Sequence, residues 1–101
     1  MIFSSVSNED IYVKNLLSIK PNPSNSSSGV LIQLEIPNDD SVIIQLFDML
    51  GNKISDIYEG SVSKGLMNLN HTFDLNLGSG IYTITVVGNK FRSSEKIVIM
   101  N

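Results

Sequence analysis

The fold is decided near the end of the chain, by the stretch Gly80-Ile81-Tyr82-Thr83-Ile84-Thr85-Val86-Val87. This stretch is rich in β-branched residues, begins at a glycine and is followed by another, which is typical of a strand. The turn residues Gly88-Asn89-Lys90 follow, and then comes a last apolar run, Lys96-Ile97-Val98-Ile99-Met100. The two runs predict an antiparallel hairpin that closes a small β-domain. The end of the chain is therefore expected to be ordered, although chain ends commonly fray.

Length and composition support a single all-β domain. A chain of 101 residues has room for one hydrophobic core and not for two. It contains 13 Ile and 8 Val but no Ala, so residues that suit a pleated surface replace the best helix former. We therefore expect sheets and no helices.

Charge and cysteine content exclude several classes of function. Lys and Arg total 7 against 10 for Asp and Glu, so no basic cluster is available to bind a nucleic acid backbone. The chain has no Cys, and hence no disulfide and no thiolate metal site. The first eight residues lack the apolar core of a signal peptide, and polar residues interrupt every run that could span a membrane.

Seven short strands are expected, separated by turns rich in Pro, Gly, Asn and Asp. They are Leu16–Lys20, Val30–Ile36, Ser41–Asp48, Lys53–Tyr58, Leu66–Leu75, Gly80–Val87 and Lys96–Met100. Strands at this spacing fit a seven-stranded, immunoglobulin-like antiparallel β-sandwich better than a closed barrel. Residues 1–15 have the composition of a linker, which would precede a domain formed by residues 16–101.

Several residues are expected to have a specific role in this fold. Gly51 follows Met49 and Leu50 in a chain reversal, where it would supply the positive φ that other residues resist. Tyr82 stands where a tyrosine corner would fall, with its ring packed inward and its hydroxyl bonded to upstream backbone. Phe73 is a candidate core residue, as are the alternating Met67 and Leu69.

Side chains suited to catalysis or metal binding are sparse. His71 is the only histidine, so a site with two imidazoles cannot be built, and we expect this residue on a solvated strand face. Ser63 and Asp74 are near it in sequence, but no strained Gly-x-Ser-x-Gly turn is present. The turn Asn38-Asp39-Asp40 lacks the spaced ligands of a calcium loop. No catalytic, cofactor-binding or metal-binding residue is therefore predicted, and the protein is not expected to be an enzyme.

The terminal run of residues 96–100 allows two interpretations. As an exposed edge, this apolar and proline-free segment could add to the sheet of a partner through backbone hydrogen bonds. The simpler interpretation is a last sandwich strand that serves packing. Physical reasoning alone favours the simpler one, because every sandwich needs a final strand.

Four segments, taken in order, resemble a known family. They are Leu17-Ser18-Ile19-Lys20-Pro21-Asn22-Pro23, Val42-Ile43-Ile44-Gln45-Leu46-Phe47-Asp48-Met49-Leu50-Gly51-Asn52, Leu77-Gly78-Ser79-Gly80-Ile81-Tyr82 and Lys96-Ile97-Val98-Ile99. Together they resemble the type A C-terminal sorting domain of the type IX secretion system of Bacteroidetes, over about residues 16 to 101. Lys20 and Asn101 stand where that family often has an aromatic and a basic residue.

The resemblance implies a folded address tag at the end of a secreted cargo protein. In that family the tag is recognised in the periplasm by the outer-membrane translocon, and a sortase-like peptidase then usually cuts upstream of it. The cargo ends at the cell surface or outside the cell. On this chain the cut would fall in or before residues 1–15.

The residues that match the motifs of the family are the expected sorting-motif residues. They are Pro21, Asn22, Pro23, Gly51, Gly80, Tyr82, Lys96, Ile97, Val98 and Ile99. Most of them would maintain the fold that the translocon reads. The alternative from a different functional class is an immunoglobulin-like binding or adhesion module of a cell-surface protein, which would grip its ligand with loops such as Ser24–Gly29.

Overall fold

The computed structural model describes residues 11–12, 16–74 and 76–101, and this part of the chain contains strands and no helix. Accordingly, none of the described residues belongs to a helix that could cross a membrane. The strands are β1 (Ile11–Tyr12), β2 (Leu17–Lys20), β3 (Val30–Ile36), β4 (Asp40–Phe47), β5 (Lys53–Val62), β6 (Gly65–His71), β7 (Gly80–Val87) and β8 (Phe91–Ile99). The expected all-β class is therefore confirmed.

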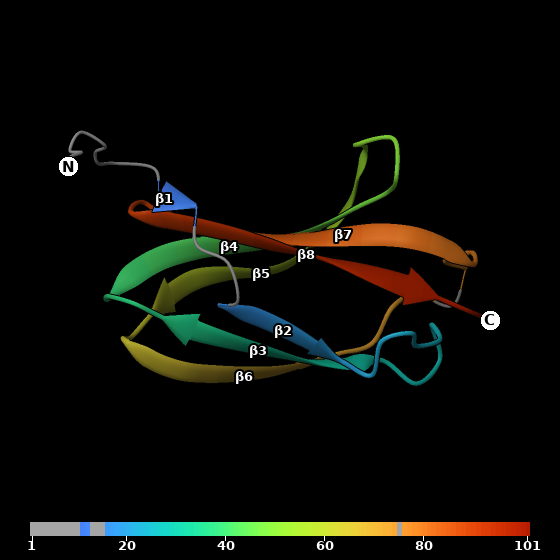
Figure 1. Cartoon of the computed structure of the whole chain (residues 1–101), viewed down its shortest axis with the longest axis horizontal. Helices are drawn as coiled ribbons and strands as arrows, with labels where there is room; N and C mark the ends of the chain where they lie inside the picture. Colours follow the sequence, from blue (N-terminus) through green and yellow to red (C-terminus); the bar gives the residue numbers. More distant parts are fainter. Residues whose placement is uncertain (1–10, 13–15, 75) are drawn as a thin grey trace, which may run out of the picture.

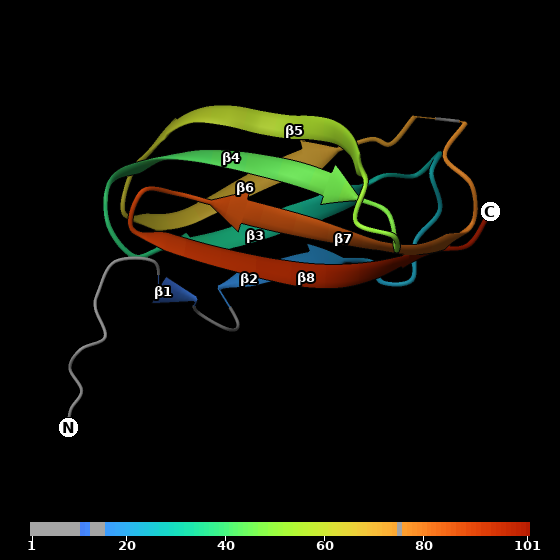
Figure 2. The same cartoon turned by 90° about the horizontal axis from the view of Figure 1, so that it is seen from above.

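The strands form two sheets that pack face to face as a β-sandwich (Figure 1). The larger sheet has the order β1-β8-β7-β4-β5, and the smaller sheet has the order β2-β3-β6. Every pairing is antiparallel except that of the two-residue β1, which runs parallel to β8. Viewed from above, the larger sheet covers the smaller one (Figure 2).

Alternating side chains explain why two sheets form and where the core lies. In β3, Ile32, Leu34 and Ile36 are buried, while the residues between them face outward or are half-buried. The same period of two recurs in β4, β7 and β8. Burial of these apolar faces between the sheets is the main term that stabilises the fold. Phe73 also belongs to the core, and Met67 and Leu69 pack against its edge.

The observed strands differ from the expected ones mainly at their ends. β8 begins at Phe91, five residues before the apolar run that predicts it, and β6 ends at His71 rather than at Leu75. β1 lies inside the segment expected as a linker and is paired with Phe91 and Arg92. The other residues of that segment, 1–10 and 13–15, lie outside the described residues, as does Leu75.

Two aspartates fasten the turns at the end of the sandwich away from the C-terminus. The Asp39 carboxylate accepts a hydrogen bond from the backbone N–H of Lys64, which belongs to the turn between β5 and β6. The Asp40 carboxylate accepts bonds from the backbone N–H groups of Asn89 and Lys90 in the turn between β7 and β8, and from the Asn89 amide. The segment Asn38-Asp39-Asp40 therefore joins three turns and has a structural role.

The tyrosine corner expected at Tyr82 is present. Its ring is 9% exposed, and its hydroxyl donates a 2.7 Å hydrogen bond to the backbone carbonyl of Gly78, four residues upstream. This bond holds the crossing segment before β7 against the strand that follows it. The corner therefore fixes how the chain enters the closing hairpin.

Substitutions at Tyr82 should separate packing from hydrogen bonding. Tyr82→Ala should lower the free energy of unfolding by about 3–5 kcal/mol, because it leaves a cavity in the core. Tyr82→Phe keeps the ring and should cost only about 1 kcal/mol, the net value of one hydrogen bond. Urea unfolding of both variants measures the difference, and equal losses for the two would contradict this assignment.

The carboxylate of Asp40 should make stability depend on pH in the acid range. Partial burial pushes the pKa of Asp40 upward, but hydrogen bonds from Asn89, Ser41 and Lys90 outweigh it and hold the pKa below 3.8. Because the folded pKa is depressed, this stabilisation is complete above pH 3.8 and is lost as the pH falls through the folded pKa. Thermal melts should show Asp40→Ala less stable than the parent at pH 7, with the gap closing at low pH. A gap that is constant with pH would contradict this assignment.

Candidate functional site

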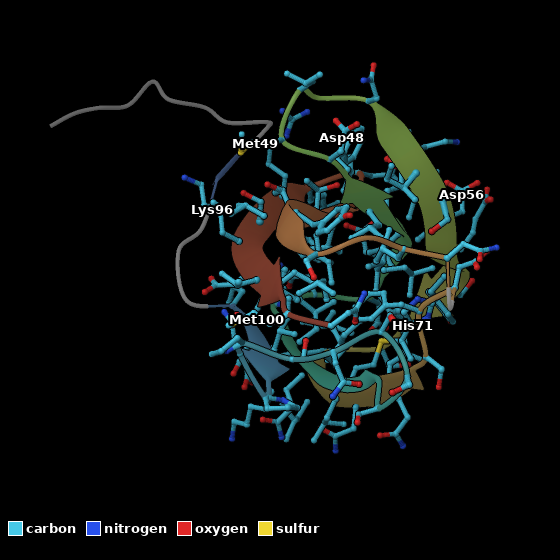
Figure 3. The ribbon with its side chains drawn as sticks, turned by 90° about the vertical axis from the view of Figure 1, so that its right-hand side faces the viewer. Asp48, Met49, Asp56, His71, Lys96 and Met100 are labelled. Carbon is cyan, nitrogen blue, oxygen red and sulfur yellow. The ribbon has the colours of Figure 1, made fainter. Side chains whose placement is uncertain are left out.

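Most of the expected sorting-motif residues meet at one end of the sandwich, where the chain ends. This end includes the segment between β2 and β3, the start of β7 and the last residues of β8 (Figures 1 and 2). Lys96 and Met100 mark the side of β8 in the end-on view of Figure 3. The segments that carry these residues are far apart in the sequence, so only the complete fold brings them together.

Asn22 joins the opening motif to the terminal strand. Its side-chain NH2 donates to the backbone carbonyl of Lys96 at 3.1 Å, and its side-chain oxygen accepts from the backbone N–H of Val98 at 3.0 Å. An amide that both donates and accepts in this way imitates the backbone of a neighbouring strand. Pro21 and Pro23 flank it, and both follow cis peptide bonds. Asn22 thereby covers the outer edge of β8 at Lys96 and Val98.

Ser24 continues the same cover by one more residue. Its backbone N–H donates to the carbonyl of Val98, and its carbonyl accepts from the backbone N–H of Met100. These bonds form an isolated parallel bridge opposite Ile99. The edge of the last strand is therefore occupied over Lys96–Met100, so the interpretation as a packed final strand is confirmed there and strand addition at that place is not available.

Asn101 ties the end of the chain to two loops. Its side-chain oxygen accepts from the backbone N–H and the hydroxyl of Ser26, and its NH2 donates to the carbonyl of Leu77 at 2.7 Å. Its own backbone N–H donates to the hydroxyl of Ser79. We call Asn22, Ser24, Ser26 and Asn101 the terminal latch. A basic side chain at position 101 could donate such bonds but could not accept them.

The motif residues of β7 and β8 lie opposite one another in the larger sheet. Gly80 pairs with Ile99, and Tyr82 pairs with Ile97. Ile97 and Ile99 are fully buried, whereas Lys96 and Val98 point to the outer face. Half of the terminal motif thus belongs to the core, and the other half is accessible to a partner.

Gly51 lies apart from this cluster, in the hairpin between β4 and β5. Its φ of +89° confirms the expected left-handed conformation. The Asp48 carboxylate accepts from the backbone N–H groups of Leu50 and Asn52, and its pKa is lowered chiefly by the bond from Asn52. The tip of the hairpin presents Met49 and Leu50, which are 71% and 84% exposed.

His71, Asp74 and Ser63, from which no catalytic site is predicted, do not form a triad. His71 is half-buried against Phe73, with ring centroids 5.1 Å apart, rather than on a solvated face, and burial lowers its pKa. Asp74 accepts from the backbone of Asn76, and Ser63 lies at the opposite end of β6. Among the described residues no cluster of His, Asp and Glu could hold a metal ion.

Sequence reasoning did not identify the terminal latch as a unit. Asn22 was expected from its motif, but Ser24 and Ser26 were assigned only to a polar loop. Their partners are about 75 residues away in the sequence. No local signal could have revealed these contacts, because they exist only in the folded sandwich.

Comparison with known proteins gives one match. The family model described as "Secretion system C-terminal sorting domain" matches residues 18–100. No curated protein and no solved structure matches the chain. The match covers most of the chain and includes every strand from β3 to β8.

The terminal latch should contribute measurably to stability. Asn101→Ala removes the hydrogen bonds of its amide to Ser26 and Leu77 and should lower the free energy of unfolding by about 1–3 kcal/mol. Asn22→Asp keeps the acceptor for Val98 but places a carboxylate against the Lys96 carbonyl, and a similar loss is expected. Met100→Ser is the control, because the side chain of Met100 is largely exposed. Denaturant melts in which all three variants match the parent would show that the latch contributes no stability.

Proposed function

The chain belongs to the family of type IX secretion system C-terminal sorting domains, and from that premise we propose that it directs a cargo carried on the same polypeptide to the outer-membrane translocon. The observation that carries the proposal is the ordered chain end. The terminal motif is held between β7 and the Asn22–Ser24 segment, so it is presented in one fixed shape. A receptor can bind a rigid surface without the loss of conformational entropy that ordering a flexible segment would cost.

The sorting family consists of signals rather than enzymes, so we propose no catalytic activity for this domain. We infer that the domain passes through the periplasm with its cargo and that the cargo reaches the cell surface or the medium. Its partners are then the translocon, the upstream cargo and a sortase-like peptidase. The pairing of β1 with β8 favours a cut upstream of Ile11 rather than within β1.

The strand order also supports an immunoglobulin-like arrangement. If β2 to β8 are taken as seven successive strands, the first, second and fifth form one sheet, and the others form the second sheet. In immunoglobulin constant domains the fourth strand joins the first sheet, whereas β5 pairs with β4 in the other sheet. We therefore propose a variant of that fold with a switched fourth strand.

An adhesion module is the weaker alternative. It would need free loops at one end, but the Ser24–Gly29 loop is engaged in the terminal latch through Ser24 and Ser26. Asn25 accepts bonds from Ser27 and Ser28 within the same loop. No feature of this loop favours ligand binding over support of the chain end.

A secretion assay tests the proposal directly. Three fusions to a fluorescent cargo with an export signal are expressed in a bacterium with a type IX system: the cargo alone, the cargo with the whole chain, and the cargo with the chain lacking Lys96–Asn101. Only the fusion with the whole chain should reach the surface or medium, while all three should reach the periplasm. Secretion of the cargo alone, or unchanged secretion of the truncated fusion, would falsify the proposal.

A further inference from the structure

The edges of the two sheets are protected to very different degrees. The outer edge of β8 is covered by β1 at one end and by Asn22 and Ser24 at the other. β2 has only four residues and is followed by Pro21. β5 carries charged residues and two register shifts against β4. Charges, shortness, prolines and bulges are the means by which proteins keep sheet edges from pairing.

β6 has none of these protections. Its sequence, Gly-Leu-Met-Asn-Leu-Asn-His over Gly65–His71, contains no Asp, Glu, Lys, Arg or Pro. It pairs with β3 over all seven residues without a register shift, and the described residues provide no strand on its other side. It is therefore a regular edge without charges or proline, of the kind on which an extended segment adds easily.

The direction of the free backbone groups follows from the register. The backbone N–H of Glu35 in β3 donates toward β2, to the carbonyl of Leu16. Because the direction alternates along an antiparallel strand, Leu34 directs its groups toward β6 and meets Met67 there. The residues between these contacts, Leu66, Asn68 and Asn70, then direct their N–H and C=O groups toward the open edge.

The space beside β6 is also apolar. Ile57 and Tyr58 of β5 and Met67 and Leu69 of β6 are half-buried and line this side of the core. β5 reaches farther out than most of β6 when seen from above (Figure 2), so the smaller sheet ends beneath an overhang of the larger one. On the opposite side of the sandwich, Asn22 and Ser24 cover the outer edge of β8 over Lys96–Met100. We call the gap between β5 and β6 the open seam.

The charges at the two ends of the open seam differ. A hollow at the end near the C-terminus is lined by Asp56, His71, Phe73 and Asp74, among other residues. Asp56 and His71 lie together on one side in the end-on view, away from Lys96 (Figure 3). A second hollow at the other end includes Lys64 beside Tyr58 and Met67. Asp56 already pairs with Lys53 at 3.2 Å, so Asp74 is the carboxylate of this hollow that would attract a positive charge on an occupant near His71.

We propose that an extended segment of the translocon adds to the free edge of β6 as a fourth strand of the smaller sheet. This inference rests on the proposed function. The segment alternates apolar and polar residues, with its apolar side chains facing the open seam and a basic residue near Asp74. Its backbone bonds to the outward groups of Leu66, Asn68 and Asn70. A second copy of the chain fits less well, because the overhanging β5 strands of the two copies would meet.

Two substitutions block this edge in different ways. Asn68→Pro removes an outward N–H and keeps the backbone hydrogen bonds to β3, but it also removes the side-chain bond that Asn68 accepts from Gln33. Leu66→Lys leaves that bond in place and adds a charge on the free edge, where the native side chain is 61% exposed. Glu59→Pro is the matched control, because the register of β5 directs the Glu59 N–H outward from the other free edge and Glu59 lines neither hollow of the open seam. Thermal melts identify any variant that does not fold. If one of the two β6 substitutions prevents folding, the other still tests the edge.

The fluorescent-cargo assay with these variants decides the matter. The two β6 variants should be secreted at least tenfold less than the parent, while the control is secreted normally. Normal secretion of folded β6 variants overturns this inference and leaves the sorting function intact. Failure of the parent fusion itself overturns both. Concentration-dependent dimers of the isolated chain that Asn68→Pro abolishes, with secretion unchanged, would assign the edge to a second copy instead.

Discussion

The structure depends on the capture of its last strand from both sides. The final residues of β8 pair with β7 on one edge and with Asn22 and Ser24 on the other, so the chain end has the environment of a central strand. The contacts of Asn22 join residues 74 and 76 positions apart. Such contacts form only when the intervening sheets are in place, because the loop that they close spans most of the chain. Order at the chain end therefore reports that the whole domain has folded.

The two ends of the sandwich are held together by different kinds of polar groups. At one end the carboxylates of Asp39 and Asp40 hold three turns together. At the other end neutral amides and hydroxyls of Asn22, Ser26 and Asn101 hold the chain end. The lowered pKa of Asp40 makes the first end sensitive to acid, whereas the latch contains no group that titrates near neutral pH. The end that carries the sorting motif therefore keeps its hydrogen bonds across physiological pH.

The sequence predicted the elements well where burial imposed a period of two. β3, β4 and β7 lie within a residue of their expected bounds, and Tyr82 and Gly51 have the expected conformations. The start of β8 escaped detection because its inward positions include Ser93, a buried residue whose hydroxyl has no hydrogen-bond partner among the described residues. A polar residue at a core position leaves no apolar alternation to recognise.

Features that depend on distant contacts could not be predicted in the same way. β1 has only two residues and exists through its pairing with β8, so local composition gave a linker instead. The terminal latch also depends on distant contacts. Ser26 and Asn101 have no distinctive local sequence signal, and they bond to each other only in the folded domain. The family motifs did identify Asn22 and the terminal strand. They could do so because a motif records long-range constraints that hydropathy does not contain.

The outer edge of β8 is covered and the outer edge of β6 is free, and this difference links the stability of the domain to its recognition. Near its end, the outer edge of β8 is covered by Asn22 and Ser24 of the same chain. The hydrogen bonds of that edge therefore stabilise the fold and are not available to a partner. The seam beside β6 leaves backbone groups and half-buried apolar side chains uncovered, so pairing there would not disturb the latch. A strand that added beside the end of β8 would have to displace Asn22 and Ser24, and it would thereby loosen the chain end. Because the free edge of β6 is separate from the covered edge of β8, a partner can bind to the folded domain without unfolding the part that it recognises.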